Sequence, residues 1–280
     1  MRCDLKMLAV RAYDLRQDVL DIIVSVGGGH IGGDMSSMEI MLTLYNRMNV
    51  SPDRQDDPNR DRFVLSKGHC VETLYAVLAD KGFLDINEVK ARFSKFGSEY
   101  IGHPHNTLPG IEMNSGSLGH GLSVCAGMAL AGKMDRRNYR VYTLMGDGEL
   151  AEGSVWEGAM AAGHYRLDNL CAVIDRNHLQ ISGNTEDVMG HHDLHARFAA
   201  FDWHVIDVAD GNDVNQLNAA FDEAEQTKGK PTLIIANTVK GKGAAIMENK
   251  ASWHHHLPNA EEYAAISKEL KERKEALLHE

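Results

Sequence analysis

The chain has 280 residues, of which 43% are hydrophobic and 25% charged, and its formal net charge is −11 at pH 7. This composition is typical of a globular protein, and the acidic balance argues against nucleic acid and against an anionic membrane surface as partners. The sequence shows neither an apolar run of ~18 residues nor a signal-peptide pattern, and its four cysteines lack a Cys-x-x-Cys spacing. These features predict a cytoplasmic protein with reduced thiols.

Hydrophobic periodicity predicts a chain that alternates between helices and strands. The expected helices cover residues 4–26, 36–48, 71–79, 118–132, 154–162, 191–200, 213–226 and 260–279. The expected strands cover residues 62–66, 139–144, 169–175, 203–208 and 231–237. Because strand and helix alternate throughout the second half, we expect an α/β protein with a parallel sheet and helices on both faces. No internal repeat or low-complexity linker divides residues 1–280, so we expect a single domain.

Three segments between these elements are expected to be loops that serve a ligand. Residues 27–33 contain five glycines in seven positions, which predicts unusual backbone angles or close approach to a ligand. Residues 100–117 and 240–258 are long and interrupted by glycine and proline. Loops on a rigid scaffold carry a large share of binding and catalytic residues, so all three are candidate site segments.

The Gly146-Asp147-Gly148 turn lies between an expected strand and an expected helix. Ligands of parallel α/β sheets bind outside the carboxyl ends of the strands. Glycines allow the backbone to approach a ligand, and free N–H groups at a helix start favour an anion. A lone carboxylate would repel a phosphate group. Asp147 would instead favour phosphate binding if it held Mg²⁺, because this ion binds carboxylates together with phosphate oxygens.

Asn177 is a candidate second ligand for the same cation. It follows the strand expected at 169–175 and lies 30 positions after Asp147, about the length of one β-α-β unit. Such a unit brings two strand ends side by side, so the two side-chain oxygens would face one hard cation. Taken singly, Gly-Asp-Gly is also a common turn and Asn a common cap. The pair at this spacing favours the metal site.

The combination of Gly146-Asp147-Gly148 with Asn177 resembles the thiamine diphosphate motif. The wider sequence resembles the N-terminal half of a transketolase, because four further segments match that family in the same order. These segments are residues 28–33, 66–69, 102–104 and 116–121.

The resemblance implies which residues hold the cofactor and its metal. It implies Mg²⁺, or Ca²⁺ or Mn²⁺ in its place, bound by Asp147, Asn177 and the carbonyl oxygen of Leu179. The residues implied to contact thiamine diphosphate are Gly116, Ser117, Leu118, Gly148, Glu149, Asn177 and His254. For the last of these the register stays open, because His255 and His256 follow directly.

His30, His69 and His103 each lie in a loop rich in glycine or containing proline. In transketolases the matching histidines surround the reactive carbon of the cofactor and the sugar hydroxyls. The resemblance therefore implies that they stabilise a developing oxyanion and shuttle protons. A structural role is the alternative for each. The polar run 191–195 also contains three histidines, but a solvated helix start is favoured over a zinc site there.

Asp34 departs from the family's pattern, which has Ser after the two glycines. We expect this carboxylate to lie near the mouth of the active site, where it would disfavour anionic groups of a substrate. The sequence therefore leaves the identity of the sugar open.

The resemblance implies a transferase that moves a two-carbon ketol unit from a ketose to an aldose, with sugar phosphates or related sugars as substrates. One alternative is another thiamine enzyme, such as a 2-oxo acid dehydrogenase α subunit or a deoxyxylulose-phosphate synthase. A second is a cofactor-binding subunit without turnover.

The resemblance also implies a partner chain. Transketolases need a pyrimidine-binding domain, whose glutamate activates the cofactor across a subunit interface. The 280 residues account only for the diphosphate half. We therefore expect an obligate partner subunit that carries the pyrimidine domain, in an assembly of two copies of each chain. The helix expected at 118–132 and the loop near His103 are candidate contact surfaces.

Overall fold

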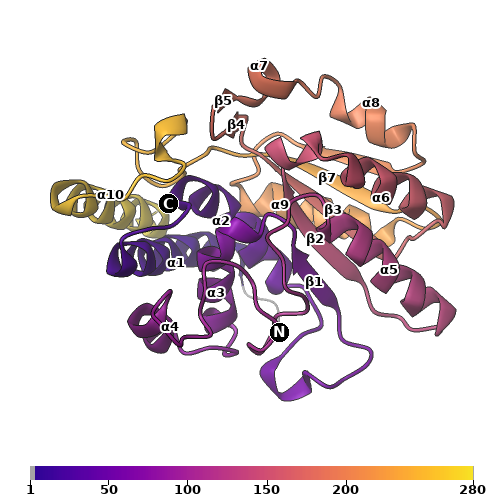
Figure 1. Ribbon diagram of the computed structural model, residues 1–280, viewed down its shortest axis with the longest axis horizontal. Helices are drawn as coiled ribbons and strands as arrows, with labels where there is room; N and C mark the ends of the chain where they lie inside the picture. The colour runs from indigo at the N-terminus through magenta and orange to yellow at the C-terminus, as the bar shows by residue number, and fades with distance from the viewer. Residues whose placement is uncertain (1–3, 280) are drawn as a thin grey trace.

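A five-stranded parallel sheet in the order β1-β2-β3-β7-β6 runs through the centre of the computed structural model, which describes residues 4–279 (Figure 1). The strands are β1 (Arg62–Leu65), β2 (Val141–Gly146), β3 (Leu170–Arg176), β6 (His204–Val208) and β7 (Thr232–Asn237). A separate antiparallel pair joins β4 (Leu179–Gln180) to β5 (Gly183–Asn184). The predicted α/β fold with a parallel sheet is confirmed.

Helices cover both faces of the sheet, as predicted (Figure 1). One face carries α1 (Leu5–Val26), α2 (Ile31–Tyr45), α3 (Val71–Asp80), α9 (Val214–Gln226) and α10 (Ala260–His279). The other carries α5 (Gly121–Met134), α6 (Gly153–His164) and α8 (Leu194–Ala199). Two further helices are α4 (Ile86–Arg92) and α7 (Thr185–Met189).

Alternate residues of β3 feed two separate hydrophobic cores. Cys171 and Val173 pack into the core under α1 and α2, whereas Ala172 and Ile174 pack into the core under α5 and α6. Successive side chains of a strand point to opposite faces, so a strand covered on both sides must be apolar throughout. This arrangement leaves the ends of the strands as the places where polar residues gather.

Helix α2 begins at Ile31, five residues before the start expected at residue 36. Gly32 and Gly33 therefore lie in its first turn and not in a loop. A Cβ on Gly32 would lie 2.9 Å from the carbonyl oxygen of Trp253, and one on Gly33 would lie 2.8 Å from the Cys70 sulfur. The two glycines allow the segments of Trp253 and Cys70 to pack closely against the helix. The sequence around the glycines does not show that these segments lie there.

Two other predicted helices have different bounds. The helix expected at 118–132 begins at Gly121, because residues up to His120 belong to the loop that reaches the sheet edge. The helix expected at 191–200 is present as α8, which begins at Leu194 after the side-chain cap of Asp193. Helix α7, capped by Asn184, lies before it in the chain.

The described helices include none that is both long and apolar enough to cross a membrane. Three cysteines, Cys70, Cys125 and Cys171, are buried free thiols, as the reduced state predicts. Cys3 lies outside the described residues.

Gly163→Ala is expected to destabilise the chain by about 3 kcal/mol. A Cβ at this position of α6 would lie 1.8 Å from the carbonyl oxygen of Phe201, a backbone atom that cannot rotate aside. Gly127→Ala is the matched control, because nothing lies within 4 Å of the added carbon in α5. That change is expected to stabilise the chain by up to about 1 kcal/mol through helix propensity. Urea unfolding of both variants measures the contrast, and similar midpoints would contradict it.

Candidate functional site

A cavity of about 400 Å³ opens at the carboxyl ends of the sheet strands. Its lining residues are His30, Gly33, Lys67, His69, Gly116, Leu118, Gly146, Asp147, Gly148, Glu149, Asn177, Leu179, Gln180, Ile181, Ser182, Lys240 and His254. Most of the predicted site residues are among them. A larger cavity of about 890 Å³ lies at the amino ends of the strands and is lined by none of the predicted residues. The smaller cavity is therefore the candidate site.

Asp147 ties the loop after β2 to the loop after β3. One of its oxygens accepts from Gly148 N at 2.8 Å, and the other accepts from His178 N at 2.8 Å and Thr185 Oγ1 at 3.1 Å. Burial, with Asp175 nearby, raises the pKa of Asp147 to about 6. A buried carboxylate with no cationic side chain bonded to it among the described residues suits a metal ligand.

Asn177 and Leu179 belong to the same loop as the backbone that Asp147 holds. The side-chain oxygen of Asn177 accepts from Leu179 N at 3.2 Å, and its amide nitrogen donates to Ser36 Oγ at 3.3 Å. The carbonyl oxygen of Leu179 accepts from Lys240 Nζ at 3.0 Å. The predicted ligand set is thus gathered in two bonded loops and consists of oxygens alone, which fits Mg²⁺.

A buried ion pair between Lys67 and Asp175 lies behind these loops and was missed by the sequence analysis. Asp175 also accepts from Ser36 Oγ at 2.7 Å and from Asn177 Nδ2 at 3.2 Å. Burial opposes the charge of both partners, yet the pKa of Asp175 is lowered by Lys67 and the pKa of Lys67 is raised by Asp175. The ion pair therefore orients the Asn177 side chain.

Glu149 lines the cavity, but both of its carboxylate oxygens accept hydrogen bonds from other groups of the protein. They accept from Gly119 N at 2.8 Å, from Gly146 N at 3.1 Å and from the Ser66 hydroxyl. Burial raises the pKa of Glu149. This carboxyl group joins the loops after β1 and β2 to the start of α5, so its contribution to a ligand site is to hold those loops together.

Three imidazole rings, those of His30, His69 and His254, surround the mouth of the cavity. Their centroids are 4.9 Å apart for His30 and His69, 5.5 Å for His30 and His254, and 5.8 Å for His69 and His254. Burial is the main cause that lowers the pKa of His30 to about 4 and that of His254 to about 3, and it lowers the pKa of His69 as well. All three rings are therefore neutral near pH 7 and carry one donor and one acceptor nitrogen each.

His103 is not among the lining residues but packs directly behind one of them. Gly116 has φ of 139°, and a Cβ there would lie 2.4 Å from the Cδ2 atom of His103. Only glycine allows both the backbone angle and the ring contact. Ser117 lies outside the lining as well, and its hydroxyl lies 3.2 Å from His120 Nδ1. The loop at 100–117 thus places His103 against Gly116, which lines the cavity.

Of the three consecutive histidines, His254 lines the cavity. Its Nδ1 atom lies 2.9 Å from Lys240 Nζ. His256 bonds to Glu262 instead, with 2.9 Å between Nε2 and Oε2. The sequence left open which of the three histidines faces the cavity, and the structure favours His254. Lys240, which the sequence analysis did not select, is a second cation at the cavity after Lys67; its Lys-Gly-Lys-Gly context after β7 was the available signal.

Asp34 does not lie at the mouth of the cavity, so that expectation was wrong. The side chain is fully buried, and its Oδ1 accepts from Thr73 N at 2.8 Å. Because α2 begins at Ile31, Asp34 occupies the first helical turn, which packs against α3. Burial raises the pKa of Asp34 to about 7, beside the Glu72 carboxyl group.

Asp34→Asn is expected to stabilise the chain, relative to the parent, more at about pH 8 than at about pH 5. The folded-state pKa of Asp34, about 7, lies above the ordinary value. The folded chain thus holds an extra proton between those values, and the parent loses stability as pH rises through that window. An asparagine keeps the acceptor for Thr73 and cannot ionise. Urea midpoints of both proteins across the window measure the difference, in which the titrations of groups distant from Asp34 and its neighbour Glu72 cancel; a constant difference would contradict the assignment.

Comparison with known proteins places this site in context. The description "Transketolase, thiamine diphosphate binding domain" belongs to a family model that matches residues 9–275. An apulose-4-phosphate transketolase subunit from Phocaeicola vulgatus is 47% identical over 271 residues, which is 96% of each chain. A 6-deoxy-6-sulfo-D-fructose transketolase subunit from a Clostridium species is 40% identical over 93% of this chain and 94% of its own.

Full-length enzymes match over only part of their length. The human transketolase is 42% identical over 89% of this chain, but the match covers 40% of that protein. The crystal structure of the Campylobacter jejuni transketolase superposes with a TM-score of 0.90 at 29% identity, over 98% of this chain and 43% of that one. The chain thus spans less than half of these longer proteins and nearly all of the subunits.

Proposed function

This chain belongs to the transketolase family, and on that premise we propose that it is the diphosphate-binding subunit of a two-subunit enzyme. The enzyme transfers a two-carbon ketol unit from a ketose to an aldose. One observation carries this proposal: relatives of the same length are named as transketolase subunits. We further propose that residues 1–280 form one domain, since both hydrophobic cores share one sheet.

Asp147, Asn177 and the carbonyl oxygen of Leu179 would hold Mg²⁺, because they are oxygens gathered in two bonded loops. Gly148 N and the Gly116–Leu118 backbone would face the diphosphate and the rest of the cofactor. When bound, thiamine diphosphate supplies the nucleophilic carbon and the electron sink for carbon–carbon bond cleavage. Glu149 holds the loops that form this cradle.

Lys240 would complete the charge balance of the site. Its ammonium group lines the cavity, and burial lowers its pKa to about 8, so it remains largely protonated near pH 7. A cation there would pair with a diphosphate oxygen, with His254 beside it as a neutral donor. This arrangement gives the anionic cofactor two positive neighbours, the metal and Lys240, because the charge of Lys67 is balanced by Asp175.

His30, His69 and His103 would act on the substrate. Since burial lowers the pKa of each, all three are neutral near pH 7. A neutral imidazole can donate a hydrogen bond to a developing oxyanion and accept a proton from a hydroxyl group. The cluster around the cavity mouth favours ketol transfer over a cofactor-binding role without turnover.

Phosphorylated or otherwise anionic sugars are compatible with the site. The carboxyl group of Asp34 was the sequence feature that argued against them, and it is buried away from the cavity. Two named relatives act on apulose 4-phosphate and on 6-deoxy-6-sulfo-D-fructose, both of which carry an anionic group. We propose substrates of this class for the present chain.

The partner would be a transketolase chain with the pyrimidine-binding domain, in an assembly of two copies of each chain in the cytoplasm. The chain purified alone is expected to show no ketol transfer. Mixed with the product of its neighbouring open reading frame, thiamine diphosphate, Mg²⁺ and a ketose phosphate, it is expected to gain activity and to form a larger complex that contains both chains. Full activity of the chain alone would refute the two-subunit proposal.

A further inference from the structure

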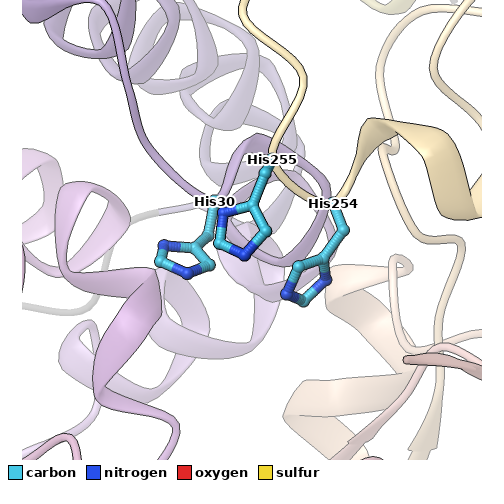
Figure 2. Close-up of side chains that lie close together, drawn as sticks. All are labelled: His30, His254 and His255. Atoms are coloured by element: carbon cyan, nitrogen blue, oxygen red, sulfur yellow. The ribbon is translucent and has the colours of Figure 1, made fainter. Parts of the chain in front are cut away.

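A second group of three imidazoles, different from the group around the cavity described above, is not explained as a group by the proposed function. His30, His254 and His255 each offer a ring nitrogen, and these nitrogens all lie within 4.8 Å of one another. Figure 2 shows the three rings gathered together, one from the start of α2 and two from the loop that follows the short helix η4 (Ala251–Trp253). His255 is exposed and lies outside the cavity lining, so the ketol-transfer proposal does not use it.

The two segments that carry the cluster are held together by the backbone. Gly241 N donates to the carbonyl oxygen of Gly32 at 2.9 Å, which joins the loop after β7 to the first turn of α2. A Cβ on Gly32 would lie 2.9 Å from the carbonyl oxygen of Trp253, so η4 packs tightly on the same turn. Because the backbones are fixed, the three rings stay close without a large conformational change.

The ring geometry suits one metal ion. The centroids of His30 and His255 are 4.1 Å apart, and those of His254 and His255 are 4.6 Å apart. Zn²⁺ binds histidine nitrogens at about 2.0–2.1 Å in tetrahedral geometry, and three histidines with an open fourth position are a known catalytic arrangement. The ring nitrogens lie within 4.8 Å of one another, so binding one ion requires the rings to move closer together, and His255 is the exposed ring of the three.

The donor set selects the class of ion. Imidazole nitrogens favour Zn²⁺, Cu²⁺ and Ni²⁺, whereas Mg²⁺ and Ca²⁺ prefer oxygen. Protons do not compete for the His30 and His254 nitrogens near pH 7, because burial keeps the pKa of His30 at about 4 and that of His254 at about 3. The nearby ammonium groups of Lys240 and Lys67 oppose a cation and make the site weaker than a structural zinc site.

Lys240 bonds to one nitrogen of His254 and is the competitor for it. The distance from Lys240 Nζ to His254 Nδ1 is 2.9 Å, and the same ammonium group also reaches the carbonyl oxygen of Leu179 at 3.0 Å. When His254 turns to a metal ion, Lys240 therefore keeps a hydrogen-bond acceptor. The bond costs affinity but does not block the site.

We propose that His30, His254 and His255 bind a borderline transition-metal ion, Zn²⁺ foremost, at a site distinct from the oxygen ligands around Asp147. Two of these side chains are those proposed above to serve substrate and cofactor. An ion held by them excludes the sugar, so it inhibits ketol transfer. This inhibitory consequence rests on the proposed function, whereas the binding itself does not.

The test is calorimetric titration of the untagged chain with Zn²⁺, paired with Co²⁺ titration followed by visible absorption. The parent chain is expected to bind one ion and to give Co²⁺ bands that depend on histidine ligands. His255→Ala is expected to weaken Zn²⁺ binding at least 10-fold, in line with the loss of a direct ligand. His256→Ala is the matched control, since that ring bonds to Glu262 and is expected to leave affinity unchanged.

Unchanged Zn²⁺ affinity and stoichiometry in His255→Ala, or equal losses in both variants, would overturn the proposal. Excess Mg²⁺ is expected not to compete, and competition would equally count against a nitrogen site. With the partner chain present, Zn²⁺ is expected to inhibit the parent enzyme at lower concentrations than it inhibits His255→Ala. If no ketol transfer occurs at all, the proposed function fails while the binding titrations still decide the metal site.

Discussion

Asp147→Ala is expected to abolish Mg²⁺-dependent binding of thiamine diphosphate in the assembled enzyme. Removing a group that only supports a metal ligand costs about 10–100-fold in affinity, so the loss of a charged direct ligand should cost on the order of 100-fold or more. The substitution also removes the acceptor for His178 N and Thr185 Oγ1, which releases the loop that carries Asn177 and Leu179. Both effects act on the same oxygen site.

Two further variants test whether the loss of affinity comes from the missing charge of Asp147 or from the released loop. Asp147→Asn keeps an acceptor oxygen and removes the charge, so it should lose most of the cofactor affinity while preserving the fold. Asp187→Asn changes an exposed carboxylate on the nearby helix α7 and should bind the cofactor normally. Calorimetric titration with thiamine diphosphate, with and without Mg²⁺, measures all three. An unaltered affinity in Asp147→Ala would sink the metal assignment.

His30→Ala, His69→Ala and His103→Ala are each expected to lower turnover of the assembled enzyme by about 10²–10⁴-fold, the usual contribution of a positioned proton donor or acceptor. The rings of His30 and His69 lie 4.9 Å apart at the cavity, and His103 packs on Gly116 beside them. Since no described ion pair holds these rings, folding stability should fall much less than turnover.

Turnover must be expressed per folded molecule, because His69 is largely buried and its removal leaves a gap. His105→Ala is the control from the same loop, where the half-buried residue places its Nδ1 atom 2.8 Å from Thr107 Oγ1. It should retain full activity. Loss of melting temperature with turnover per folded molecule preserved would instead show that these histidines are structural.

Elements whose apolar pattern is local could be predicted from the sequence. The long helices α1 and α10 and all five strands of the parallel sheet fall where periodicity placed them, within a few residues. A half-buried strand buries every second residue and a helix buries every third or fourth, and the apolar residues of the sequence show these spacings directly. The Gly-Asp-Gly turn and Asn177 were recognisable for the same reason, since both follow strands directly.

The start of α2 and the place of Asp34 could not be predicted in this way. Glycines normally disfavour helix, so Gly32 and Gly33 indicated a loop. The helix forms there because the segments of Trp253 and Cys70, distant in sequence, need the space that side chains would fill. Contacts across the fold outweighed the local preference, and Asp34 turned inward with the helix.

The sequence alone determined the family and the fold class, and it supplied the proposed oxygen ligands, because these depend on short motifs and their order. Only the tertiary structure decided which of the three consecutive histidines lines the cavity, that Lys67 pairs with Asp175, and that Lys240 reaches both Leu179 and His254. These contacts join residues on separate loops at one edge of the sheet. Their partners are chosen by packing and by the need to pair every buried charge, and neither is written in the spacing of residues along the chain.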